Sequence, residues 1–124
     1  LSPTVDIETI KMTKRYGAIS IPGAFTPTEI LKAFESGADI IKVFPISCVG
    51  PAYIKDIKGP LKQIPLLATG GINLDNISAY INSGSSGVGL GSSLVNSKFE
   101  VNEEYLNELT EKAIKFVNKV NECV

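Results

Sequence analysis

The chain alternates short apolar runs with stretches in which apolar residues recur every three or four positions. The apolar runs have the length of β-strands and lie at residues 18–23, 39–45, 65–71 and 85–93. Segments with helical spacing, the third of them short enough to be a turn, lie at residues 6–15, 26–37, 52–62, 73–84 and 102–120. This order predicts an α/β fold with a parallel sheet and right-handed crossovers. Because the strands are almost continuously apolar, we expect helices on both faces of the sheet.

Local capping signals mark where two of the predicted helices begin and end. Thr26, with Glu29 three residues later, forms a capping box at the start of one helix. That helix is expected to stop at Gly37, because glycine readily takes the backbone conformation that ends a helix. Asn73 is expected to cap the helix that ends at Gly84.

One charged residue interrupts the most apolar run, DIIKVFP, at residues 39–45. Strand side chains alternate, so Lys42 shares a face with Ile40 and Phe44. Burial disfavours the charged ammonium and leaves a neutral amine, which is what imine formation with a carbonyl compound requires. The strand pattern alone leaves open a lysine that reaches solvent from the strand end or pairs with a carboxylate such as Asp39.

Two glycine-rich turns follow the last two predicted strands. They are TGGI at residues 69–72 and GLGSS at residues 89–93. Glycines in such turns let backbone N–H groups approach an anion, and a following helix N-terminus adds a favourable dipole. In (β/α)₈ barrels the loops after the last two strands frequently form a phosphate site. The pair therefore indicates phosphate binding, with two plain turns as the alternative.

Composition places the chain among ordinary globular domains. It has 124 residues, 44% of them hydrophobic, and a net charge of −1. This charge balance does not indicate a nucleic-acid or anionic membrane partner, and no apolar run approaches the ~20 residues of a membrane span. Residues 1–15 lack the continuous apolar core of a secretory leader. With only two cysteines, far apart in the sequence, we expect a reducing, cytoplasmic setting.

The absence of histidine narrows the chemistry that the chain can perform. It excludes a serine–histidine or cysteine–histidine nucleophile system within the chain. Cys48 and Cys123 alone do not make a zinc site, so we expect neither a metal nor a cofactor. Cys48 is interpreted as an ordinary thiol, because no histidine is present to activate it. Chemistry must then depend on lysine, carboxylates, hydroxyls and backbone groups.

Five segments, taken in order, resemble the class I 2-keto-3-deoxy-6-phosphogluconate (KDPG) aldolases. This group includes 4-hydroxy-2-oxoglutarate (KHG) aldolases and a phosphogalactonate homologue. The segments are IPGAFTPTEI at 21–30, DIIKVFP at 39–45, GPAYIKDIKGP at 50–60, PLLATGGI at 65–72 and VGLGSSL at 88–94. The joint pattern is specific, because a K-x-F-P strand, a T-G-G turn and a G-x-G-S turn occur together at fitting spacings.

The resemblance implies a role for particular residues of this chain. Lys42 matches the lysine that forms a Schiff base with the substrate. The positions that match substrate-binding residues are Pro22, Gly23, Phe44, Pro45 and Thr69. Those that match the phosphate-binding turns are Gly70, Gly71, Gly91 and Ser92.

The resemblance also implies a TIM-type (β/α)₈ barrel, commonly trimeric, that needs no metal. The implied reaction cleaves a phosphorylated 2-keto-3-deoxy sugar acid to pyruvate and an aldehyde. Residues 1–124 supply only about four of eight strands, so we interpret them as one domain, the C-terminal half of a barrel and a fragment of a larger chain. No position matches the family's general-base glutamate or its carboxylate-binding arginine. Association with a second copy would cover the open edges of such a half-barrel.

Two alternatives to the aldolase remain at this stage. One is a non-catalytic half-barrel that keeps the anion-binding turns and binds a phosphorylated ligand. The other is a different phosphate-binding barrel enzyme, such as an epimerase or a thiamine-phosphate synthase-like protein, although those reactions need no imine-forming lysine.

Overall fold

The structure, a computed structural model, describes residues 1–124. The helices are α1 (Ile7–Arg15), α2 (Pro27–Glu35), the 3₁₀ helix η1 (Ile46–Cys48), α3 (Pro51–Lys58), α4 (Ile77–Asn82) and α5 (Glu103–Asn121). The strands are β1 (Gly23–Ala24), β2 (Ile41–Val43), β3 (Leu66–Thr69) and β4 (Gly87–Gly89). Helices and strands alternate as predicted from the apolar periodicity.

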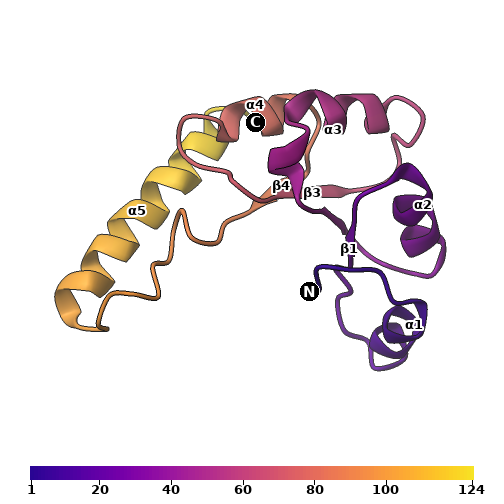
Figure 1. Ribbon diagram of the computed structural model, residues 1–124, viewed down its shortest axis with the longest axis horizontal. Coiled ribbons are helices and arrows are strands. Elements are labelled where there is room, and N and C mark those ends of the chain that lie inside the picture. The colour runs from indigo at the N-terminus through magenta and orange to yellow at the C-terminus, as the bar shows by residue number, and fades with distance from the viewer.

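The four strands form one parallel sheet in the order β1-β2-β3-β4. Each strand is therefore joined to its spatial neighbour by a connection that contains a helix, as expected for repeated βα units. Figure 1 shows α3 and α4 along one side of the sheet, with α1 and α2 at one end and α5 at the other. The carboxyl ends of all four strands meet at a single edge, where side chains from separate units come together.

The hydrophobic core lies between one face of the sheet and the helices. Ile41 and Val43 of β2 are fully buried there, as are Leu66 and Ala68 of β3. The helices contribute mainly isoleucines, namely Ile30, Ile54, Ile57 and Ile77. Burying each such side chain contributes roughly 1.5–3 kcal/mol before the cost of ordering it. The fully buried side chains of β2 and β3 therefore all lie on this single face.

The opposite face of the sheet is not covered. Lys42, Leu67 and Thr69, which alternate with the core residues, are only half-buried, and so are the three residues of β4. The expectation that helices cover both faces is therefore wrong. An apolar run predicts a strand within a sheet. It does not by itself show that both faces of that strand are covered in this chain.

The first and last strands are shorter than the apolar runs that predicted them. Regular pairing of β1 starts only at Gly23, although the Pro22 carbonyl already accepts a hydrogen bond from the Lys42 N–H at 2.9 Å. Proline has no N–H to return, so the ladder cannot begin before it. β4 ends at Gly89, and residues 90–93 of the predicted strand form a turn instead.

The structure confirms the predicted cap of α2 but not the predicted cap of α4. Thr26 and Glu29 form the predicted capping box at the start of α2. Asn73 does not cap α4, which begins later, at Ile77. The Asn73 side chain instead accepts hydrogen bonds from the N–H groups of Asp75 and Asn76, and so builds a turn before the helix. None of the helices combines the length and apolar content needed to cross a membrane.

Candidate functional site

Lys42 lies at the centre of β2, between Gly23 of β1 and Leu67 of β3. Its side chain is half-buried on the uncovered face of the sheet. Its Nζ lies 4.6 Å from the centroid of the Phe44 ring, two residues along the same strand face. An aromatic face stabilises a cation at this distance. The Phe44 ring is therefore placed to contact a cationic group at Nζ, such as a protonated imine.

Lys42 is not enclosed, although enclosure was expected from the sequence, and it is not paired with Asp39, an alternative that the strand pattern had left open. Its face of the sheet is open, so the deep burial expected from the apolar strand is absent. Asp39 is not its partner, because that carboxylate binds Lys14 Nζ at 2.7 Å and accepts from the Ser20 N–H at 2.7 Å. These hydrogen bonds, led by the one from Lys14, hold the pKa of Asp39 below its usual value. No salt bridge involves Lys42.

The glycine turn after β3 packs directly on the segment that follows the lysine strand. Gly70 and Gly71 have φ values of +115° and +67°, which strain any other residue. A Cβ at Gly70 would lie 3.4 Å from the Ile46 nitrogen, and one at Gly71 would lie 3.0 Å from the Ser47 Cβ. Backbone conformation thus favours glycine at both positions, and close approach to Ser47 adds a packing reason at Gly71. The turn and the end of the lysine strand are held together at the carboxyl edge of the sheet.

The inner side of β4 carries no side chains at two of its three positions. Gly87 faces Leu67, whose Cδ1 would lie 3.1 Å from an added Cβ. Gly89 faces Thr69, and a Cβ at Gly89 would overlap the Thr69 Oγ1. The glycines therefore leave space that the side chains of β3 partly occupy. The alternation Gly-Val-Gly at residues 87–89 was the sequence signal for this feature. Gly89 was part of the predicted GLGSS turn but was not among the residues expected to bind phosphate.

These elements enclose a glycine-lined pocket of about 440 Å³ at the carboxyl ends of β3 and β4. Its lining residues are Phe44, Thr69, Gly70, Gly71, Ile72, Asn73, Gly89, Gly91, Ser92 and Ser93. Six of them were expected from the sequence, namely Phe44, Thr69, Gly70, Gly71, Gly91 and Ser92. Lys42 does not line this pocket, but its contact with the Phe44 ring places its Nζ beside the pocket wall. No lysine, arginine or carboxylate lines it.

Unpaired backbone N–H groups distinguish this pocket chemically. None of the N–H groups of residues 70–72 donates a hydrogen bond within the chain, and neither do those of residues 91–93. The hydroxyl-bearing Ser92 and Ser93 lie in the same wall. Clustered N–H groups in turns form concave anion-binding sites without a cationic side chain. The α4 helix adds nothing comparable, because it begins five residues after Ile72 and is six residues long.

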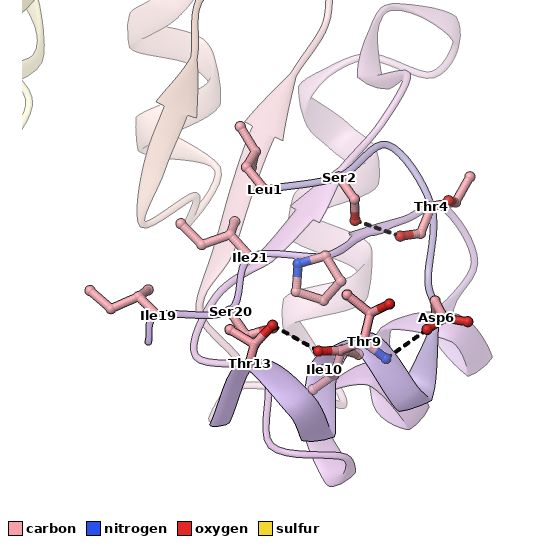
Figure 2. A pocket seen from close by; sticks show the side chains of 11 residues that line it. Leu1, Ser2, Thr4, Asp6, Thr9, Ile10, Thr13, Ile19, Ser20 and Ile21 are labelled. Atoms are coloured by element: carbon pink, nitrogen blue, oxygen red, sulfur yellow. Dashed lines mark hydrogen bonds between the residues drawn. The ribbon is translucent and has the colours of Figure 1, made fainter. Parts of the chain in front are cut away.

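A second hollow, of about 300 Å³, lies between α1 and residues 19–22 (Figure 2) and shares no lining residue with the glycine-lined pocket. Two of its polar side chains form hydrogen bonds with backbone groups of α1. The Asp6 carboxylate accepts from the Thr9 N–H at 2.6 Å, and the Thr13 hydroxyl donates to the Thr9 carbonyl at 2.7 Å. We therefore assign no chemistry to this hollow. Across the molecule, no group of three or more histidine, cysteine, aspartate or glutamate side chains is placed to hold a metal ion.

Pro22 and Gly23, expected at the mouth of the substrate pocket, are buried at the edge of the sheet. Pro22 lines the hollow beside α1, and neither residue lines the glycine-lined pocket. A Cβ at Gly23 would overlap the backbone of Pro3, which packs against β1. Gly23 therefore has a packing reason to be glycine, while its role in substrate binding stays a prediction. Pro45 lies beside Gly70 but does not line the pocket either.

Comparisons with known proteins agree on one family. A model of the family "KDPG and KHG aldolase" matches residues 1–111. The chain is 35% identical, over its full length, to 2-dehydro-3-deoxy-6-phosphogalactonate aldolase of Escherichia coli K12, of which it covers 58%. It is 39% identical over 76% of its length to a probable enzyme of the same name from Rhizobium meliloti, covering 45% of that protein.

The solved structures lead to the same group. A native KDPGal structure superimposes with a TM-score of 0.89 at 34% identity, over 98% of this chain and 57% of that one. The parallel four-stranded sheet with its helices thus corresponds to about half of a TIM-barrel-like aldolase. The chain spans only about half the length of the curated relatives named above.

Proposed function

Because the chain belongs to the KDPG and KHG aldolase family, we propose that it supplies the imine-forming lysine and the phosphate-binding turns of a Schiff-base aldolase. The proposed substrate is a phosphorylated 2-keto-3-deoxy sugar acid, the class named for its relatives. The observation that carries the proposal is the Phe44 ring, which contacts the Lys42 Nζ and also forms a wall of the glycine-lined pocket. A substrate with its phosphate in that pocket lies within reach of the amine.

In the proposed reaction the neutral amine of Lys42 attacks the ketone carbon of the substrate, and loss of one water molecule leaves an imine. The protonated imine draws electrons from the bond between C3 and C4. As this bond breaks, the C4 hydroxyl loses its proton, an aldehyde leaves, and an enamine remains on Lys42. Protonation of the enamine at C3 and hydrolysis of the imine release pyruvate and restore the amine. The Phe44 ring stabilises the cationic imine.

The unpaired N–H groups support a phosphorylated substrate rather than an unphosphorylated keto acid. Residues 70–72 and 91–93 offer six such groups around one pocket. A phosphoryl group has several acceptor oxygens to engage them, and its dianion gains most from converging dipoles. No carboxylate lines the pocket, so the acceptor for the C4 hydroxyl proton is not among these residues. Imine formation at Lys42 does not require this proton acceptor, whereas cleavage of the C3–C4 bond does. Imine formation is therefore the step to test.

Reductive trapping with pyruvate and sodium borohydride tests the proposal directly. Reduction of the imine gives a stable secondary amine, which peptide mass spectrometry locates. We expect the adduct on Lys42, no adduct in Lys42→Met, and unchanged trapping in the control Lys55→Met, which removes an exposed lysine of α3.

Two results would contradict the proposal. Trapping that persists in Lys42→Met, or is spread over surface lysines, would mean that Lys42 is not the imine-forming residue. Binding of inorganic phosphate by the wild-type chain with no pyruvate adduct would instead indicate a non-catalytic phosphate-binding half-barrel.

A further inference from the structure

The side-chain amide of Asn76 spans the glycine turn at the base of the pocket. Its Nδ2 donates a hydrogen bond to the Gly71 carbonyl at 3.0 Å. Its Oδ1 accepts a hydrogen bond from the Asn73 N–H at 2.9 Å. One side chain thus holds two successive peptide units of the turn that carries unpaired N–H groups. The sequence analysis did not single out Asn76.

The geometry of the peptide bond gives this contact a consequence for the pocket. In a trans peptide the C=O of one residue and the N–H of the next point in opposite directions. Because Asn76 binds the Gly71 carbonyl, the Ile72 N–H of the same peptide unit must point away from Asn76. Ile72 lines the pocket, and its N–H has no partner within the chain. Asn76 therefore sets the direction of one of the N–H groups available to an anion.

Asn76 is not needed to form the helix that follows it. It occupies the N-cap position of α4, yet its side chain makes no capping hydrogen bond. The turn before α4 has a separate side-chain acceptor, because Asn73 Oδ1 accepts from the N–H groups of Asp75 at 2.9 Å and of Asn76 at 3.2 Å. The amide of Asn76 is thus committed to the glycine turn rather than to the helix.

We propose that Asn76 is a positioning residue for phosphate binding, which it supports by holding the Gly71–Ile72 peptide so that the Ile72 N–H is directed into the glycine-lined pocket. This inference rests on the proposed phosphate-binding role of that pocket. Asn76 itself is not among the residues that line the pocket, so it acts through the backbone.

Titration with inorganic phosphate, followed by ¹⁵N NMR of the amides of residues 70–72 and 91–93, tests this role. We expect Asn76→Ala to weaken phosphate binding by about tenfold, the factor expected when one hydrogen bond no longer supports the bound geometry. Asn76→Leu, which keeps the side-chain volume but has no amide, should weaken binding equally.

The matched control is Asn102→Ala at the start of α5. The Asn102 Oδ1 accepts from the Tyr105 N–H at 2.8 Å, so this variant also removes a local side-chain hydrogen bond. We expect it to lower the melting temperature by a few degrees, as a lost cap does, and to leave phosphate affinity unchanged. Melting temperatures of both Asn76 variants show whether they remain folded at the temperature of the titration.

The outcomes separate this inference from the function on which it rests. Wild-type affinity in the folded Asn76 variants would overturn the role of Asn76 and leave phosphate binding standing. A loss of affinity in Asn102→Ala as large as that in Asn76→Ala would also overturn it, because the effect would then follow stability alone. Absence of phosphate binding in the wild-type chain would overturn both this inference and the phosphate site, whereas pyruvate trapping on Lys42 is measured independently.

Discussion

At the residue scale, the two glycines of the G-x-G-S motif differ in whether the structure requires a glycine. Gly89 has no room for a side chain, because the Thr69 Oγ1 occupies the position of its Cβ. Gly91 has open space around it and no positive φ, so neither packing nor backbone conformation demands glycine there. Both residues line the glycine-lined pocket. The sequence motif G-x-G-S does not distinguish these reasons, whereas the structure does.

This difference predicts unequal effects of two alanine substitutions on the free energy of unfolding. Gly89→Ala should lower the free energy of unfolding by about 1–3 kcal/mol, the usual range for overpacking, as measured by urea denaturation. Gly91→Ala is the matched control and should leave the unfolding free energy almost unchanged. Adding Thr69→Ala to Gly89→Ala should recover part of the loss, because it removes the atoms that collide. Equal stability of the two single variants would contradict the assigned contact.

At the scale of secondary-structure elements, the start of α2 ties two βα units together. The Glu29 carboxylate accepts from the N–H groups of Phe25 at 2.9 Å and Thr26 at 2.8 Å. The Tyr53 hydroxyl of α3 donates to the Phe25 carbonyl at 2.6 Å, and the two rings stack at 5.5 Å. The segment after β1 is therefore held from both sides, beside the strand that carries Lys42.

The capping contact predicts a defined pH dependence of stability. Hydrogen bonds from the backbone N–H of Thr26, and then of Phe25, hold the pKa of Glu29 below its ordinary value of 4.5. The folded state therefore favours the carboxylate, and the resulting stabilisation is complete above pH 4.5 and lost as the pH falls through the lower, folded-state pKa. Glu29→Gln lacks this titration. We expect the wild type to be more stable than the variant at neutral pH.

Urea denaturation of both proteins over a series of pH values checks this prediction. The stability difference should stay constant above about pH 5 and shrink below the ordinary pKa of Glu29. Comparing the two proteins cancels the titration of the other acids, including Asp6 and Asp39, whose pKa values are also lowered by hydrogen bonds. A difference that persists unchanged at pH 3 would show that the Glu29 carboxylate does not titrate with folding.

At the scale of the whole molecule, the sheet has two free edges and an open face. β1 and β4 each pair with one strand, whereas β2 and β3 are hydrogen-bonded on both sides. α5 leaves several apolar side chains exposed, among them Leu106, Ile114 and Val117. These features leave room for a larger assembly, but the expected trimer or other homo-oligomer stays a prediction.

The free edges predict an order of hydrogen–deuterium exchange along the sheet. Amides of β2 and β3 should exchange more slowly than those of β4, because an edge strand opens without breaking a second ladder. Mass spectrometry of peptides that cover each strand, at several protein concentrations, measures this order. Protection of β4 equal to that of β3, and rising with concentration, would show that a second copy covers this edge in solution.

The sequence predicted local features well, but it predicted poorly which strand faces and side chains are exposed to solvent. Apolar periodicity identified the four strands and the five α-helices in order but not the 3₁₀ helix η1, and the Thr26–Glu29 capping box was confirmed. The strand predicted at residues 18–23 extended too far before Gly23. Pro22 is apolar, but it has no N–H to donate a hydrogen bond to the neighbouring strand. The burial expected for Lys42 was wrong because the composition of a strand does not reveal which of its faces is covered.

The sequence by itself determined the order of the elements, one helix cap, and the residue types that can form an imine or approach an anion. These properties depend on residue types and on neighbours a few positions away in the sequence, so they do not depend on how distant segments pack. Only the tertiary structure decided that Phe44 would join the two glycine turns in one pocket, that Asp39 would bind Lys14, and that Lys42 would face an open side. Those outcomes depend on strand register and on packing between segments far apart in the chain, which local patterns do not encode.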